Sequence, residues 1–175
     1  MTPLTELHAD IDDRVDAIRA ARPDWLCRRG CDGCCRRLGE IPRLTRAEWD
    51  WLLAGLRALP AEQLDAIRQA VTRWADEPTR PLLCPLLDQA AGACRVYAHR
   101  PVACRTYGFY VERDLGLYCK DIEAQVESGE LAEVVWGNQD RVARSLRDLG
   151  ETRELTAWFE MTFGAMVKGD MVGLC

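Results

Sequence analysis

The sequence contains few of the residues and motifs on which most enzyme active sites depend. Serine occurs twice, as Ser128 and Ser145, and neither residue lies in the Gly-x-Ser-x-Gly turn of a hydrolase nucleophile. Histidine also occurs twice, and the chain has no Gly-rich phosphate loop, no Gly-Lys-Ser/Thr motif and no His-Glu-x2-His motif. These absences argue against the usual serine hydrolases, P-loop nucleotide-binding proteins and zinc proteases.

Long apolar runs are missing as well. The first 20 residues carry five carboxylates and have no apolar core of signal-peptide length. No stretch approaches the roughly 18 consecutive apolar residues of a membrane span. We therefore predict a cytoplasmic protein without a membrane partner, in which thiols stay reduced.

Cysteine, by contrast, is abundant and clustered. Eight of the nine cysteines fall in two short segments that are separated by 48 residues. The first segment has the pattern C-x3-C-x2-C-C, and in the second segment nine, nine and fourteen residues separate successive cysteines. The predicted metal ligands are Cys27, Cys31, Cys34, Cys35, Cys84, Cys94, Cys104 and Cys119. Cys175 stands apart from both segments and is predicted to take no part.

Clustered cysteines form disulfides, bind metals or serve as buried apolar residues. Disulfides need an oxidising compartment, and a chain of 175 residues with 48% hydrophobic content can bury a core without them. Buried apolar cysteines would not have polar neighbours such as Arg28, Arg29 and Asp32. Metal ligation is the favoured explanation, because two groups of four match one or two sites with four sulfur ligands each.

Positive charge is concentrated around the cysteines. Residues 27–46 contain six arginines and two carboxylates, a net charge of +4, and residues 80–120 have a net charge of +3, although the whole chain has −5. Nearby cations lower thiol pKa values and stabilise the anionic centre that four thiolates form around a metal. A sequence pI near 5.2 disfavours nucleic acid as a partner, because proteins that bind nucleic acid are usually basic overall.

Apolar residues at three- and four-residue spacing predict helices outside the cysteine segments. The predicted apolar faces are Leu4 to Ile18, Trp49 to Leu56 after a Thr45/Glu48 capping box, Leu64 to Trp74 after Pro60, Leu131 to Leu149, and Leu155 to Met166. Residues 78–119 are rich in Pro and Gly, and only Val102–Val111 suggests a strand.

These patterns predict a mainly α fold, organised as a single helical domain over residues 1–175. Its metal-binding core, residues 27–119, would consist of two irregular cysteine-bearing loop segments organised around a metal centre. Helices within residues 2–22 and 120–168 would flank this core.

The second cysteine segment contains a specific motif: Cys-Pro-x-Leu, then Cys-x2-Tyr-x2-Arg-Pro-x2-Cys-Arg, then an aromatic residue. These positions are Cys84, Pro85, Leu87, Cys94, Tyr97, Arg100, Pro101, Cys104, Arg105 and Phe109. The first segment matches the same pattern at Cys31, Cys34 and Cys35, with Cys27 at a spacing one residue wider. In these motifs, over residues 27–119, the chain resembles the YkgJ-type cysteine-cluster family, named CxxCxxCC. The resemblance implies a domain that chelates zinc or iron.

The choice of metal depends on how the cysteines are spaced. Structural zinc usually lies between paired Cys-x2-Cys turns, and Cys31/Cys34 is the one such pair among the eight. Adjacent Cys34 and Cys35 are awkward ligands for one tetrahedral zinc. A compact cysteine run with a distant ligand, and the Cys84-Pro85 pair, favour iron–sulfur ligation. We predict an iron–sulfur cluster of the 4Fe–4S type and keep Zn²⁺ as the alternative.

Four more residues are predicted to surround the sulfur ligands. Arg100 and Arg105 would orient carbonyls or thiolates, and Tyr97 and Tyr107 would pack over the sulfur. His99 lies between two of the cysteines and is predicted to face solvent or form hydrogen bonds rather than bind metal.

The predicted function is therefore metal binding, with metal ions as the first partners and a protein or peptide as a candidate partner. The role would be redox transfer, metal handling or docking. Two alternatives stay open, namely a zinc-stabilised interaction module and a metal-dependent enzyme that modifies a protein or peptide. Related cysteine-cluster sequences occur attached to enzymatic domains, which supports the second alternative, but no catalytic residue is assigned.

Overall fold

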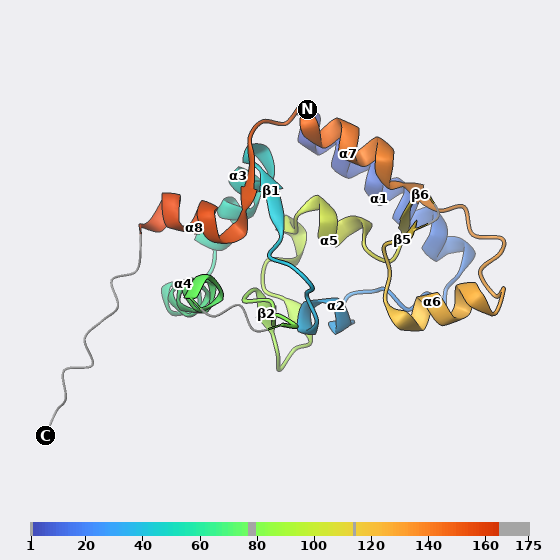
Figure 1. Ribbon diagram of the computed structural model, residues 1–175, viewed down its shortest axis with the longest axis horizontal. Helices are drawn as coiled ribbons and strands as arrows, with labels where there is room; N and C mark the ends of the chain where they lie inside the picture. Colours follow the sequence, from blue (N-terminus) through green and yellow to red (C-terminus); the bar gives the residue numbers. More distant parts are fainter. Residues whose placement is uncertain (1, 77–79, 114, 165–175) are drawn as a thin grey trace, which may run out of the picture.

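The computed structural model describes residues 2–76, 80–113 and 115–164, and helices predominate in it (Figure 1). The eight α-helices of these residues are α1 (Pro3–Ala21), α2 (Gly33–Arg36), α3 (Arg46–Arg57), α4 (Ala61–Asp76), α5 (Val102–Thr106), α6 (Lys120–Glu127), α7 (Gln139–Arg147) and α8 (Leu155–Phe163). They bear out the prediction of a mainly α fold. No helix in the described ranges is long and apolar enough to cross a membrane.

Short strands connect the helices. In the described part of the chain they are β1 (Arg43–Thr45), β2 (Leu87–Asp88), β3 (Ala93–Cys94), β4 (Tyr110–Glu112), β5 (Leu115–Gly116), β6 (Gly137–Asn138) and β7 (Thr152–Glu154). β1 pairs antiparallel with β7, β2 pairs antiparallel with β3, and β4 pairs antiparallel with β5 and parallel with β6. Most of these strands escape sequence analysis because two or three residues are too few to show a two-residue period.

Polar caps fix the starts of two predicted helices. The Thr2 side chain accepts a 3.2 Å hydrogen bond from the Thr5 N–H at the start of α1. At α3 the predicted capping box is confirmed: Thr45 Oγ1 accepts from the Glu48 N–H at 3.3 Å, and the Glu48 carboxylate accepts from the Thr45 N–H at 2.8 Å. Each such cap stabilises its helix by about 1 kcal/mol.

The prediction of one apolar stripe from Leu131 to Leu149 is wrong. Residues 128–133 form turns, Gly137 lies in β6, and only the second half of the stripe is helical, as α7. β6 pairs with β4 at Gly137, where an added Cβ would lie 2.4 Å from the ring of Tyr110. The periodicity could not reveal this pairing with a strand more than 20 residues earlier.

The prediction of a strand over Val102–Val111 is wrong except at its last two residues. Val102 begins α5, and the strand β4 begins only at Tyr110. Pro101 immediately precedes α5, where its fixed φ is compatible with a helix start. The last predicted helix is present as α8, while Met166 and Cys175 lie outside the described residues.

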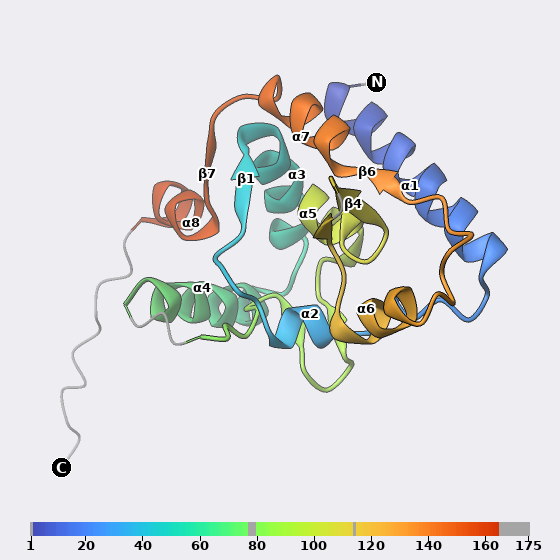
Figure 2. The same cartoon turned by 45° about the vertical axis from the view of Figure 1, so that its right-hand side comes forward.

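Buried side chains form two hydrophobic cores. The first core gathers around α3, α4 and α8, and its buried members are Leu44, Trp49, Leu52, Leu53, Leu56, Ile67, Val71, Trp74, Leu82, Leu86, Val96, Leu155, Trp158 and Phe159. The second core gathers around α1, and its buried members are Leu4, Leu7, Ile11, Val15, Ile18, Trp25, Val102, Phe109, Tyr110, Ile122, Leu131 and Val142. Figure 2 shows α4 and α8 on one side, α1 and α7 on the other, and α2 and α5 between them.

The cysteine segments lie where these two cores meet. Cys84 and Cys94 pack against the first core, and Cys27 and Cys119 pack against the second. Any group that linked these four thiols would also link the two cores.

Candidate metal centre

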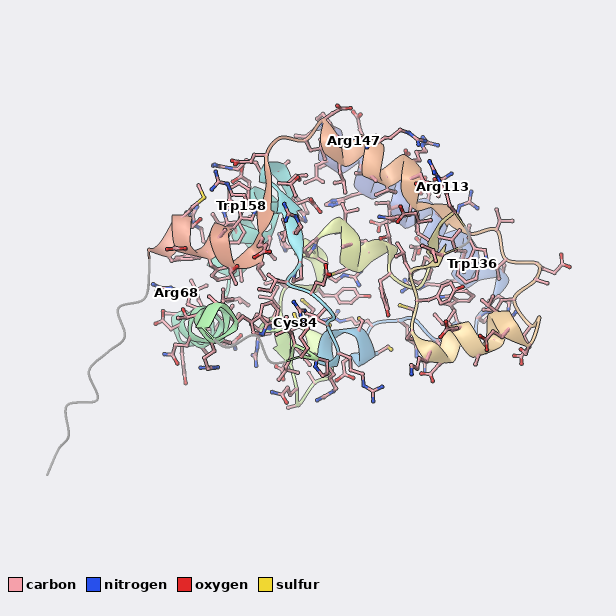
Figure 3. All side chains as sticks on the ribbon, in the orientation of Figure 1. Arg68, Cys84, Arg113, Trp136, Arg147 and Trp158 are labelled. Carbon is pink, nitrogen blue, oxygen red and sulfur yellow. The ribbon has the colours of Figure 1, made fainter. Side chains whose placement is uncertain are left out.

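Loops and short helices, rather than long elements, carry the eight cysteines. Cys34 and Cys35 lie on α2, Cys94 lies in β3, Cys104 lies on α5, and Cys119 immediately precedes α6. The other three lie in the loops at Cys27, Cys31 and Cys84. All eight are free thiols. Figure 3 shows Cys84 in the region between α4 and α2, with other sulfur atoms nearby.

Backbone hydrogen bonds tie the two cysteine segments together. Leu38 and Leu82 exchange N–H···O bonds of 3.0 and 2.9 Å in an isolated antiparallel bridge. Two residues further along, the Cys84 N–H donates a 2.7 Å hydrogen bond to the carbonyl oxygen of Cys35. The Cys84 thiol also raises the pKa of the Cys35 thiol. The fold therefore brings together cysteines that are far apart in the sequence.

The α2 pair lies at the centre of the thiol group. The interaction with the Cys35 thiol, followed by burial, raises the pKa of Cys34 far above its ordinary value. For Cys35, the Cys34 thiol lowers the pKa, but the Cys84 thiol and burial outweigh this effect and raise the pKa to about 12. Each thiolate in such a group disfavours the next one, so Cys34 and Cys35 hold their protons at neutral pH when no metal is bound.

Cys27 lies beside Tyr107 and Gly108 at the edge of the second core. Its Sγ donates a 3.4 Å hydrogen bond to the carbonyl oxygen of Tyr107. Burial, followed by proximity to Cys34 and Cys31, raises the pKa of Cys27 to about 12. An added Cβ at Gly108 would lie 3.0 Å from the Cys27 Sγ, so the glycine lets the backbone approach this sulfur closely.

Tyr107 is close to several of the same thiols. Burial raises the pKa of its phenol to about 12, and Cys34, Cys119, Cys27 and Cys31 contribute in that order. Cysteines from both segments thus surround this one ring. Its predicted role of packing over the sulfur ligands stays a prediction.

Cys94 and Cys104 complete the group on the other side. Burial raises the pKa of the Cys94 thiol, and Cys34 adds to this effect. Cys104 keeps accessible surface, yet protein atoms crowd its sulfur and raise the pKa of the thiol to about 12, with Cys34, Cys35 and Cys94 contributing. The thiols of Cys94 and Cys104 therefore lie near the α2 pair.

Arg100 supplies positive charge to both sides of the group. Its guanidinium lowers the pKa of Cys27, Cys94 and Cys104, opposing the effect of burial. It stacks over the Tyr97 ring, 3.6 Å from the ring centroid, and its Nε donates to the Tyr97 carbonyl at 3.0 Å. Arg29 also lies near this ring, with its guanidinium 5.3 Å from the centroid of Tyr97, a contact that the sequence did not reveal.

Arg105 holds the backbone of the cysteine-bearing loop. Its guanidinium donates hydrogen bonds to the carbonyl oxygens of Ala98 at 2.6 Å and Arg100 at 3.3 Å. It also pairs with Asp12 on α1 at 3.1 Å. The side chain orients carbonyls in this geometry, and its action on a metal centre stays a prediction. His99 packs against Trp51 and Gly55 on α3, with ring centroids 4.9 Å apart for the His99–Trp51 pair.

Glu48 is a residue whose second contact the sequence did not reveal. Besides capping α3, its buried carboxylate accepts a 2.9 Å hydrogen bond from the Val102 N–H at the start of α5. The capping box identified its local role, but a bond across 54 residues leaves no local pattern. Through it, the first core positions the helix that carries Cys104.

The chemistry of the donor atoms fits a thiophilic metal. Soft thiolates select zinc, iron–sulfur clusters and copper(I), and each ligand must lose its proton on binding. Within the described ranges, no three Cys, His, Asp or Glu side chains are already arranged to hold one ion. The fold thus gathers the thiols, and binding would require their side chains to close around the metal.

Comparison with known proteins places the chain in a family. No curated protein and no solved structure matches it. Residues 26–123, more than half of the chain, match the family described as a "putative zinc- or iron-chelating domain", a range that holds all eight clustered cysteines and so supports metal binding. The chain therefore belongs to the CxxCxxCC family.

Proposed function

We propose that the chain binds metal through its eight clustered cysteines, in an iron–sulfur centre with a redox, metal-handling or docking role. The observation that carries this proposal is the meeting of the two cysteine segments at the Cys84–Cys35 hydrogen bond. Thiolates this close together repel one another, and a thiophilic cation that replaces their protons compensates for that negative charge.

Two features favour iron–sulfur over zinc. Cys34 and Cys35 are consecutive on α2, so their side chains leave the helix about 100° apart. A cluster, or two neighbouring metals, accommodates two such directions more easily than one tetrahedral ion. Cys84 is followed by Pro85, as in one iron–sulfur ligand pattern. The 4Fe–4S type is the specific form proposed.

The surrounding charge supports an anionic centre. Four thiolates around a metal usually leave net negative charge, and Arg100 lies where it favours thiolates from both segments. Arg28, Arg29 and Arg37 add exposed positive charge close to the first segment. This arrangement also suits the docking of an acidic protein partner. A reducing compartment, the cytoplasm, is the location that the proposal requires.

A zinc-stabilised interaction module is the alternative. It is favoured by the position of the thiols between two cores, where a structural ion would join Cys84 and Cys94 to Cys27 and Cys119. Structural zinc contributes directly to folding in this way.

An enzymatic role has less support. A cavity of about 450 Å³ lies between α1 and α7, lined in part by Asp13, Arg14, Trp136 and Arg141. No cysteine lines this cavity, so it does not place a substrate beside the thiols.

The metal and acid-labile sulfide content of anaerobically purified protein tests the proposal. Iron and sulfide in equal amounts, with a visible absorption that dithionite bleaches, are the expected result. Colourless protein with stoichiometric zinc and no sulfide would favour the zinc module. Protein that retains neither metal and takes up none under reducing conditions would contradict metal binding altogether.

A further inference from the structure

The two hydrophobic cores group four of the cysteines differently from their order in the sequence. Cys84 and Cys94 belong to the second segment and pack against the first core. Cys119 belongs to the same segment but packs against the second core, together with Cys27 from the first segment. Sequence proximity and spatial proximity therefore give different groupings.

The α2 pair, Cys34 and Cys35, lies between the two cores, and one cysteine of the pair is assigned to each core. The Cys35 carbonyl accepts the 2.7 Å hydrogen bond from the Cys84 N–H, which fixes Cys35 next to the thiols of the first core. Cys34, one position earlier, is turned by about 100° around the helix. It lies near Cys27 and the Tyr107 phenol, where the Tyr107 carbonyl accepts the Cys27 thiol at 3.4 Å, and also near Cys94 and Cys104.

The remaining two thiols, those of Cys104 and Cys31, are grouped with the thiols that lie near them. Cys104 lies on α5, near Cys34 and near two thiols of the first-core group, Cys35 and Cys94. Cys31 lies four residues after Cys27, and it is coupled to Cys27 and to the ring of Tyr107. Grouping Cys35 with Cys84, and Cys34 with Cys27, gives four thiols on each side, and each set then draws on both segments.

We propose that the chain holds two four-thiol metal centres, each built from both cysteine segments and each resting on its own hydrophobic core. This inference rests on the proposed function and adds the division of ligands to it. The ligands of centre A are Cys35, Cys84, Cys94 and Cys104. The ligands of centre B are Cys27, Cys31, Cys34 and Cys119. Each centre takes one thiophilic ion or cluster, and the Cys34–Cys35 peptide links the two.

The division has a mechanical consequence. Centre A fastens the loop around Cys84 and Cys94 to α2, and centre B fastens the start of α6 to the loop after α1. The helix α2 supplies one ligand to each centre. Four protein ligands at each centre also leave no open coordination position for a substrate.

Partial metal loading followed by thiol alkylation tests the division. Metal-free, reduced full-length protein receives one equivalent of Zn²⁺ as the probe, then N-ethylmaleimide, and modified cysteines are mapped by peptide mass spectrometry. We expect molecules in which four clustered thiols are protected together, as the centre A set or the centre B set. A second equivalent should protect the other set, and Cys175 should be modified throughout as the internal reference.

Two other patterns would overturn the division. Joint protection of Cys27, Cys31, Cys34 and Cys35 would mean that each segment builds its own centre. Simultaneous protection of all eight would mean one shared polynuclear centre. Both results would leave metal binding intact, whereas alkylation of all eight at two equivalents of Zn²⁺ would contradict the proposed function itself.

Matched double variants provide a second measurement. C84S/C94S and C27S/C119S should each bind half as much Zn²⁺ as the wild type. Amide exchange should increase around residues 82–96 in the first variant and around residues 119–127 in the second. Loss of all Zn²⁺ from either variant with its helical circular dichroism unchanged would overturn the division, because folded protein would then show one interdependent site.

Discussion

The Cys84 N–H donates a 2.7 Å hydrogen bond to the carbonyl oxygen of Cys35, which joins the two cysteine segments. The 48 residues between them include α3 and α4, so helices of the first core close this loop. Hydrophobic packing therefore offsets part of the entropic cost of bringing the thiols together before any metal binds. A metal completes an assembly that the fold has already begun.

Replacing a clustered cysteine should release metal and loosen the fold. Cys94→Ser or Cys104→Ser removes a thiolate that a hydroxyl replaces poorly as a ligand for zinc or iron. Metal content should fall, and amide exchange should increase within residues 27–119. Cys175→Ser is the matched control, because this cysteine lies outside both segments, and it should change neither quantity. Equal metal content in all three variants would contradict the ligand assignment.

The metal-free protein should lose stability as the pH rises above about 9. The pKa of the Cys27, Cys35 and Cys104 thiols is about 12, against an ordinary value of 9.0, so the folded state keeps protons that the unfolded chain releases. This stabilisation is complete below the unfolded value and is lost as the pH passes through the folded value. We expect a loss of at least about 1 kcal/mol by about pH 11.

Urea unfolding of the metal-free protein across this range measures the effect. The metal-loaded protein is the control, because its thiols have already lost their protons, and its stability should instead fall toward acid pH as protons displace the metal. An unfolding midpoint of the metal-free protein that stays constant above pH 9 would rule out the raised thiol pKa values.

Gly108→Ala should disturb both the fold and the binding of metal. Gly108 has a φ of +84°, and an added Cβ would lie 2.9 Å from the Cβ and 3.0 Å from the Sγ of Cys27. The backbone strain alone costs about 1–2 kcal/mol, and the contact with Cys27 adds displacement of a proposed ligand. Zinc affinity and the free energy of unfolding are the two quantities to measure.

Gly129→Ala separates these two effects. Gly129 has a nearly equal φ of +81°, but an added Cβ would meet nothing within 4 Å. This variant should lose stability by a similar strain energy and keep its zinc affinity. If both variants bind zinc as the wild type does, the close approach of Gly108 to Cys27 has no role in the centre.

Glu48 should prove essential for the position of α5. Its carboxylate accepts hydrogen bonds from the Thr45 N–H, the Thr45 hydroxyl and the Val102 N–H at 2.8, 2.9 and 2.9 Å. Glu48→Ala leaves all three donors without this acceptor and should cost about 3–5 kcal/mol. Glu48→Gln keeps one acceptor oxygen and should cost about half as much. Chemical unfolding measures the cost, and equal stability of the two variants would contradict this account.

The helices were predictable where local patterns were sufficient. The stripe from Leu4 to Ile18 and the Thr45/Glu48 capping box each specify a helix from its own residues, and both are present. The region around Gly137 was not predictable, because its conformation depends on pairing with Tyr110. Short strands and tertiary turns follow from distant contacts that leave no period in the chain.

In the candidate centre, too, local motifs were predictable and contacts between distant residues were not. Clustering and motif identified the cysteines and Arg105, because both are local signals. The approach of Cys35 to Cys84 and the bond between Glu48 and Val102 depend on how the first core folds, so the sequence alone did not show them. The grouping of thiols by core is likewise a property of packing.

X-ray absorption spectroscopy at the metal edge tests the central claim, ligation by cysteine sulfur, most directly. The metal that anaerobically purified protein retains, iron or zinc, should have only sulfur atoms as its directly bonded ligands, at about 2.3 Å. Nitrogen or oxygen neighbours at about 2.0–2.2 Å as the main ligands would contradict the account, because the clustered thiols would then not hold the metal.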